Sequence, residues 1–153
     1  MPTHEKEITA PVDLCTPDGR LNPEAVGWSR TPLHRCNLRG WSRTKRWEYW
    51  CLTTPTHLVA LTLSSLDYLG LTSVYLLDYG PHRQHPTATS VTALSPLART
   101  VTLPRDLDGG QARATGKITA TITPTAGATR LRFDCATPHG RLTGDLTALL
   151  PEG

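Results

Sequence analysis

The sequence lacks the long apolar run that a membrane-spanning helix requires. No stretch of it approaches about 20 consecutive apolar residues, and the opening Met-Pro-Thr-His-Glu-Lys-Glu is not typical of a signal peptide. We therefore expect no integral membrane segment and a cytoplasmic location. Apolar residues make up 38% and charged residues 19% of the 153 positions, which disfavours a disordered chain and predicts one ordinary globular domain.

The motifs of the common enzyme classes are missing as well. There is no G-x-S-x-G, no phosphate-binding glycine loop and no G-x-G-x-x-G, which removes the simplest cases of acyl transfer, nucleotide hydrolysis and dinucleotide binding. The isoelectric point is only about 8.8, and no nucleic-acid-binding module is recognisable. The sequence thus predicts no cofactor and no nucleic-acid partner.

The cysteines form no C-x-x-C pair, and neither they nor the histidines have a familiar zinc-site spacing. In a reducing compartment they stay thiols, and we interpret them as small apolar packing residues rather than metal ligands. No metal site is expected. These cysteines are Cys15, Cys36, Cys51 and Cys135.

What the sequence does contain is alternation of period two, interrupted at short intervals by proline and glycine. This pattern predicts an all-β fold, and the short links favour antiparallel neighbours. The expected architecture is a meander that forms a barrel or a sandwich. Strands are predicted near residues 46–53, 56–65, 72–79, 89–94, 98–103, 111–123, 128–136 and 140–149.

The first part of the chain differs in character, because Pro11, Pro17, Pro23 and Pro32 are spaced through it with little alternation. We expect residues 1–45 to form an irregular N-terminal segment packed on the sheet, and residues 46–153 to form the antiparallel β domain. One short helix is predicted at 23–26, where Asn22 can cap, Pro23 takes the first helical position and Gly27 ends the turn.

All four tryptophans lie within 23 residues that also hold six basic residues and one acid. One interpretation is a ligand site in which cations meet an acidic group while indoles contact an apolar body. The other is structural, with indoles plugging the fold and arginines stacked on them. The candidate ligand-binding residues are Trp28, Trp41, Arg43, Lys45, Arg46, Trp47, Trp50 and Tyr68.

Alternation on a strand at 47–52 puts Trp47, Tyr49 and Cys51 on one face and Glu48, Trp50 and Leu52 on the other. A carboxylate beside tryptophan on an inward face could act as a general acid with a raised pKa. It could equally be an outward partner of a neighbouring cation.

Two further acids lie at the ends of apolar strands. An aspartate in a turn, such as Asp67, more commonly stabilises the turn than acts as a catalyst. Asp78 ends the next strand with Tyr79, and the sequence leaves open whether the two acids share a rim. The candidate catalytic residues are Glu48, Asp67 and Tyr49.

Several segments together suggest a relative. They are Ile8-Thr-Ala-Pro-Val-Asp-Leu-Cys15, Gly19-Arg-Leu-Asn-Pro-Glu-Ala-Val-Gly-Trp28, Pro32-Leu-His34, Arg39-Gly-Trp41, Lys45-Arg-Trp-Glu-Tyr-Trp50 and Ser64-Ser-Leu-Asp-Tyr68. Over residues 8–79 the chain resembles an uncharacterised bacterial family, domain of unknown function 2804, in its N-terminal half only. The resemblance implies longer members, and it supplies no activity and no catalytic residue. A similarity to lipocalin-like carotenoid hydratases implies an apolar ligand in a β barrel.

These observations lead to three hypotheses about function. The first is a module that binds an apolar or amphipathic small molecule, such as a lipid or isoprenoid. The second is a hydratase or isomerase that uses acid and base carboxylates. The third is a structural half that needs a partner chain, in which exposed edges and apolar surface lead to self-association.

Overall fold

The computed structural model describes residues 4–42, 44–82, 84–105 and 110–150. By its contacts the chain divides into two compact units, Met1–Thr44 and Lys45–Gly153, which we describe separately. That the first segment packs on the sheet stays a prediction.

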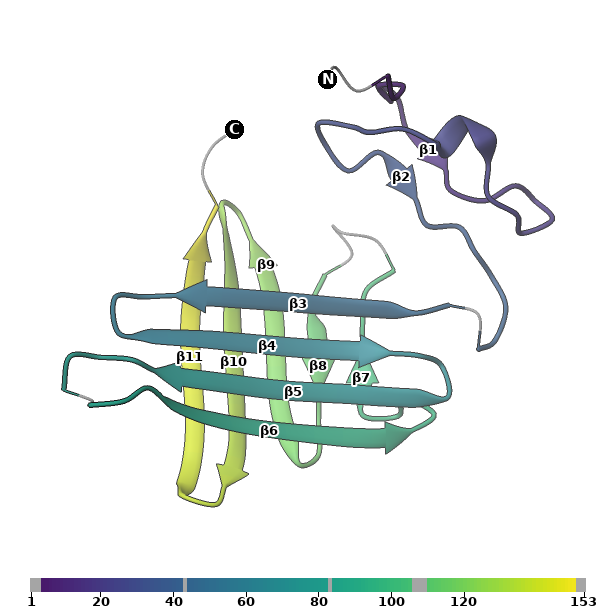
Figure 1. The fold of residues 1–153 in the computed structure, drawn as a ribbon. Helices are drawn as coiled ribbons and strands as arrows, with labels where there is room; N and C mark the ends of the chain where they lie inside the picture. The colour runs from purple at the N-terminus through teal and green to yellow at the C-terminus, as the bar shows by residue number, and fades with distance from the viewer. Residues whose placement is uncertain (1–3, 43, 83, 106–109, 151–153) are drawn as a thin grey trace. The chain divides into compact units, whose positions relative to one another are not determined.

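The first unit holds two short strands and one turn of helix (Figure 1). Strands β1 (Val12–Asp13) and β2 (His34–Arg35) pair in parallel. The predicted helix is confirmed as a single 3-10 turn, η1 (Pro23–Ala25), and the Asn22 side chain accepts a hydrogen bond from the Glu24 N–H. This cap satisfies one of the free donors at the start of the turn.

The second unit contains two antiparallel sheets in which every strand pairs with its neighbour in sequence. The four-stranded sheet has the order β3-β4-β5-β6, and the five-stranded sheet has the order β11-β10-β9-β8-β7. In Figure 1 the strands of one sheet run across those of the other. Their bounds are β3 Arg46–Thr53, β4 His57–Ser65, β5 Leu69–Asp78, β6 Thr87–Pro96, β7 Val101–Thr102, β8 Ala112–Ala114, β9 Ile118–Thr125, β10 Ala128–Thr137 and β11 Gly140–Leu149.

The core of the second unit lies between the two sheets. Inward-facing residues of both sheets form one apolar cluster, with Leu61, Leu63, Ile118, Ile122 and Leu131 fully buried. Burial of such side chains stabilises the fold by about 1.5–3 kcal/mol each. Because the sheets remain separate, the predicted meander is a sandwich and not a closed barrel.

Two expectations need correction. The strand predicted at 111–123 is two strands, β8 and β9, because Gly116 has φ +98° and forms a turn between them. Of the four free cysteines only Cys135 is buried, while Cys36 and Cys51 are exposed. Their interpretation as packing residues is therefore wrong for those two.

The outer faces of the two sheets differ in charge. The five-stranded sheet directs six charged side chains outward from β8, β10 and β11. The four-stranded sheet has eighteen outward strand positions, and none of these described positions is charged. We call them the uncharged face: Trp47, Tyr49, Cys51, Thr53, Leu58, Ala60, Thr62, Ser64, Leu69, Leu71, Ser73, Tyr75, Leu77, Ala88, Ser90, Thr92, Leu94 and Pro96.

Candidate functional site

Strand β3 carries most of the predicted site residues of the second unit, and the predicted alternation is confirmed. Glu48, Trp50 and Leu52 face inward, opposite buried residues of β4. The Trp50 indole N–H donates to the Glu48 carboxylate over 3.1 Å. Trp50 also packs against the core cluster. Glu48 therefore satisfies a half-buried donor, which is a structural task.

On the opposite side of β3, Trp47 and Tyr49 point outward at one edge of the uncharged face. The Trp47 side chain is 65% exposed and Tyr49 is 56% exposed. Residues two apart on a strand lie about 7 Å from each other, so the two rings can contact the same ligand. A hydrogen bond with the Cys51 side chain raises the pKa of the Tyr49 phenol above its usual value, which disfavours the phenolate at neutral pH.

The start of β3 meets the turn between β4 and β5. Arg46 pairs with Ser65, and the turn that follows contains Asp67 and Tyr68. Asp67 has φ +66°, and the Leu66 N–H donates to the Leu69 carbonyl across the turn over 2.8 Å. This geometry identifies Asp67 as a turn residue, which Asp tolerates in the left-handed region.

The remaining predicted ligand residues lie outside this cluster. Trp28 and Trp41 belong to the first unit, where Trp28 hydrogen-bonds through its backbone to Lys6 and Ile8. The Arg30 guanidinium stacks on the Trp28 ring at 5.1 Å, as the structural interpretation expects. Arg43 lies outside the described residues. Lys45 is exposed and immediately precedes β3.

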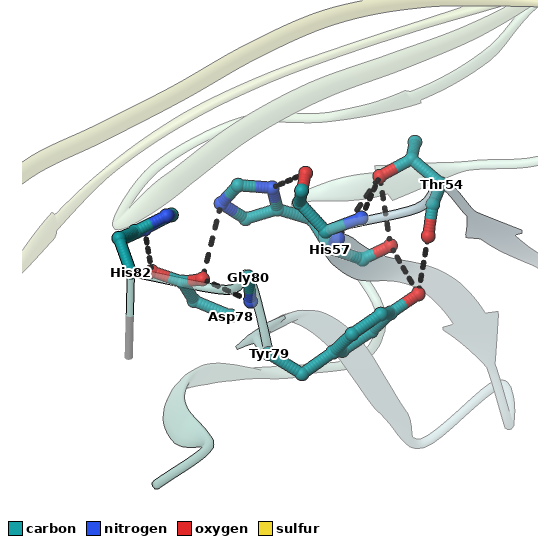
Figure 2. A network of polar contacts seen from close by, with 7 residues as sticks. Thr54, His57, Asp78, Tyr79, Gly80 and His82 are labelled. Atoms are coloured by element: carbon teal, nitrogen blue, oxygen red, sulfur yellow. Dashed lines mark hydrogen bonds and ion pairs between the residues drawn. The ribbon is translucent and has the colours of Figure 1, made fainter. Parts of the chain in front are cut away.

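A polar network at the other end of the four-stranded sheet was not anticipated (Figure 2). His57 begins β4 and pairs in register with Asp78, which ends β5. The Asp78 carboxylate is largely buried, with one oxygen 3.7 Å from His57 Nε2 and the other 3.5 Å from His82 Nε2. The Gly80 N–H donates to Asp78 over 3.0 Å. The network ties the β5–β6 connection to the hairpin.

The chemistry of this network is limited. The Thr56 hydroxyl lies 2.8 Å from His57 Nδ1, and the Tyr79 hydroxyl donates to the Thr54 and His57 carbonyls. Within the described ranges, no three His, Cys, Asp or Glu side chains are arranged to hold a metal ion. The contact of His57 with Asp78 could be found only from register pairing, because these two residues are far apart in sequence.

The outer face of the five-stranded sheet has an open hollow of about 630 Å³ with arginine, aspartate and threonine side chains around it. Arg130 donates two hydrogen bonds of 2.7 Å to Asp145, and Arg132 donates a third of 3.1 Å. The hydrogen bonds from Arg130, and then those from Arg132, lower the pKa of Asp145 to about 2. The charges here largely pair with each other, so this hollow is a weak candidate for an anion site.

The lowered pKa of Asp145 makes a prediction about acid stability. Because the folded-state pKa lies below the usual 3.8, the ion pair stabilises the fold above about pH 4 and loses this effect as the pH falls towards 2. Asp145→Asn should therefore lower the urea midpoint at pH 7 but match the wild type near pH 2. If the urea midpoints of Asp145→Asn and the wild type differed by the same amount at every pH from 7 to 2, this prediction would be wrong.

The candidate acids and bases do not converge. Glu48 faces inward, Tyr49 faces outward, and Asp67 lies in the turn beside the start of β3. Asp78 lies at the opposite end of the hairpin, so the rim left open by the sequence is not shared. What converges instead are Trp47, Tyr49 and the uncharged face, with Lys45 two residues before Trp47 in the chain. Arg46 does not join them, because it lies on the side of β3 that carries Glu48.

Comparison with known proteins places the chain in a family. The model of a family described as Domain of unknown function (DUF2804) matches residues 5–153, well beyond the resemblance seen over residues 8–79. No curated protein and no solved structure matches the chain. Among the described residues no helix is long and apolar enough to cross a membrane. The protein belongs to the family of Domain of unknown function (DUF2804).

Proposed function

We propose that the protein binds an apolar or amphipathic small molecule, lipid-like or isoprenoid-like, on the uncharged face. The observation that carries this proposal is the lack of any charge at the eighteen positions of that face, combined with the exposure of Trp47 and Tyr49. An outer sheet face that meets only water normally alternates to polar and charged residues. Exposed aromatic rings such as those of Trp47 and Tyr49 are the kind of apolar surface that marks interaction sites.

The edge of this face suggests where a polar head group would lie. Lys45 is exposed and lies two residues before Trp47, whereas Arg46 is exposed at the start of β3 but belongs to the side of the strand that carries Glu48. A ligand whose chain contacts Trp47 and Tyr49 would bring a carboxylate or phosphate at its end towards Lys45. An acidic amphipath should therefore bind more tightly than its neutral analogue.

The hydratase or isomerase hypothesis is less well supported. General acid–base catalysis needs an acid and a base within hydrogen-bond reach of one substrate. Glu48 and Tyr49 lie on opposite sides of β3, and the Glu48 carboxylate already accepts from Trp50. Binding without catalysis is the better account of this arrangement.

Calorimetric titration with dodecanoate and with 1-dodecanol tests the proposal. We expect saturable binding of both, with the acid favoured. The double variant Trp47→Ala and Tyr49→Ala should weaken both affinities at least about tenfold, because two large aromatic contacts are lost. Lys45→Gln should weaken only dodecanoate binding.

The matched control is Leu149→Ala, which removes another exposed apolar side chain from β11 in the other sheet. It should leave both affinities unchanged. Unaltered binding by the double aromatic variant would contradict the site, and absence of saturable binding by the wild type would contradict this class of ligand.

A further inference from the structure

The uncharged face is an open surface, and an open surface cannot enclose a ligand. Small-molecule sites usually bury about 70–90% of the ligand. A chain lying on one sheet would leave its other side in water. The site of the proposed function is therefore incomplete in a single copy, and something must cover it.

The exposure of side chains on this face supports the same conclusion. Trp47, Tyr49 and Leu94 are 65%, 56% and 62% exposed, so three large side chains of this face offer apolar surface for contact. The outer face of the other sheet instead carries paired charges such as Arg130 and Asp145. Of the two outer faces, the uncharged face is therefore the better candidate for an interface.

The absence of charge on this face indicates which kind of partner fits it. A face without charges gains nothing from a charged surface, but it can stack on an identical face without bringing like charges together. Two sheet faces can stack about 10 Å apart, which is the spacing at which the sheets of a sandwich pack. A two-fold axis would place each face against its own copy.

The area of the face agrees with a weak association. Four strands about 4.8 Å apart and about eight residues long span roughly 400–500 Å² in plane. Two such faces bury about 800–1,000 Å², close to the lower limit of about 1,000 Å² for specific interfaces. Dimerisation should therefore depend on protein concentration.

We propose that two copies of this chain stack their uncharged faces, so that Trp47 and Tyr49 of each copy cover the ligand bound by the other. This inference rests on the proposed function for the ligand, but the association itself can be measured without it. The ligand adds apolar contact to both faces and should tighten the dimer.

Sedimentation velocity of the full chain over a range of concentrations tests the association. We expect the mass to rise from the 16.7 kDa of one copy towards twice that value, and dodecanoate should shift the rise to lower concentration. Thr92→Lys, at an exposed position of the face, and Thr62→Lys, near its middle, should weaken dimerisation at least tenfold. Thr119→Lys on the outer face of the other sheet is the matched control and should have no effect.

The outcomes separate the two proposals. A wild type that stays monomeric at every concentration, or a dimer unaffected by both lysine variants, overturns the dimer. A monomer whose urea midpoint falls in Thr92→Lys would mean that the same chain covers the face, which also overturns it. If a monomeric wild type still binds dodecanoate through Trp47, only the dimer is wrong. If the dimer forms but neither probe binds, only the ligand proposal is wrong.

Discussion

Phe133→Ala is expected to lower the free energy of unfolding by about 3–5 kcal/mol. The Phe133 side chain is 5% exposed and belongs to the apolar cluster between the sheets. Its removal deletes apolar contacts and leaves a cavity that the rigid strands on either side can only partly close. Urea unfolding followed by tryptophan fluorescence measures the loss, because all four tryptophans remain in this variant.

The control for this substitution is Thr119→Ala, which truncates an exposed side chain on the outer face of the adjacent strand. Surface changes of this kind usually alter stability by less than about 0.5 kcal/mol. If Phe133→Ala cost no more than this control, the core between the sheets would not be packed as described.

Gly144→Ala is expected to destabilise the protein by about 1–3 kcal/mol or more, although it adds only one methyl group. Gly144 lies on the edge strand β11 directly opposite Phe133. A Cβ at position 144 would lie 2.3 Å from two carbons of the Phe133 ring, so the ring would have to move within a packed core. The glycine leaves room for an aromatic ring that covers the strand edge.

A double-mutant cycle separates this clash from a general effect of glycine. In the Phe133→Ala background the space above position 144 is empty, so Gly144→Ala should cost far less there than in the wild type. The coupling is measured from the four unfolding curves. Additive effects of the two substitutions would show that the ring does not occupy the space above the glycine.

Much of the β domain could be predicted from the sequence. The predicted strand at 46–53 coincides with β3, and that at 140–149 coincides with β11. The inward and outward sides of β3 also followed from alternation alone. These features are local, because successive side chains on a strand point to opposite sides whatever the strand pairs with. The glycine turn at Gly116 was missed because a left-handed residue interrupts alternation without changing its period.

The candidate site depended on pairing between distant segments. The concentration of tryptophan and basic residues suggested one cluster, yet Trp47 and Trp50 face opposite sides of β3, and Trp28 holds Arg30 within the first unit. The contact of His57 with Asp78 required the register of the β4–β5 hairpin. A one-residue shift of that register would have moved every side chain to the other face.

The sequence by itself determined the all-β class, most strand positions and the alternation of side chains, because these depend on neighbours along the chain. Only the tertiary structure decided that the meander forms two separate sheets, and which side of each sheet is covered. The uncharged face is the clearest case, since its members come from four strands. Strand pairing brings these residues, which are far apart in sequence, onto one continuous face. That this face carries no charge can therefore be seen only in the tertiary structure.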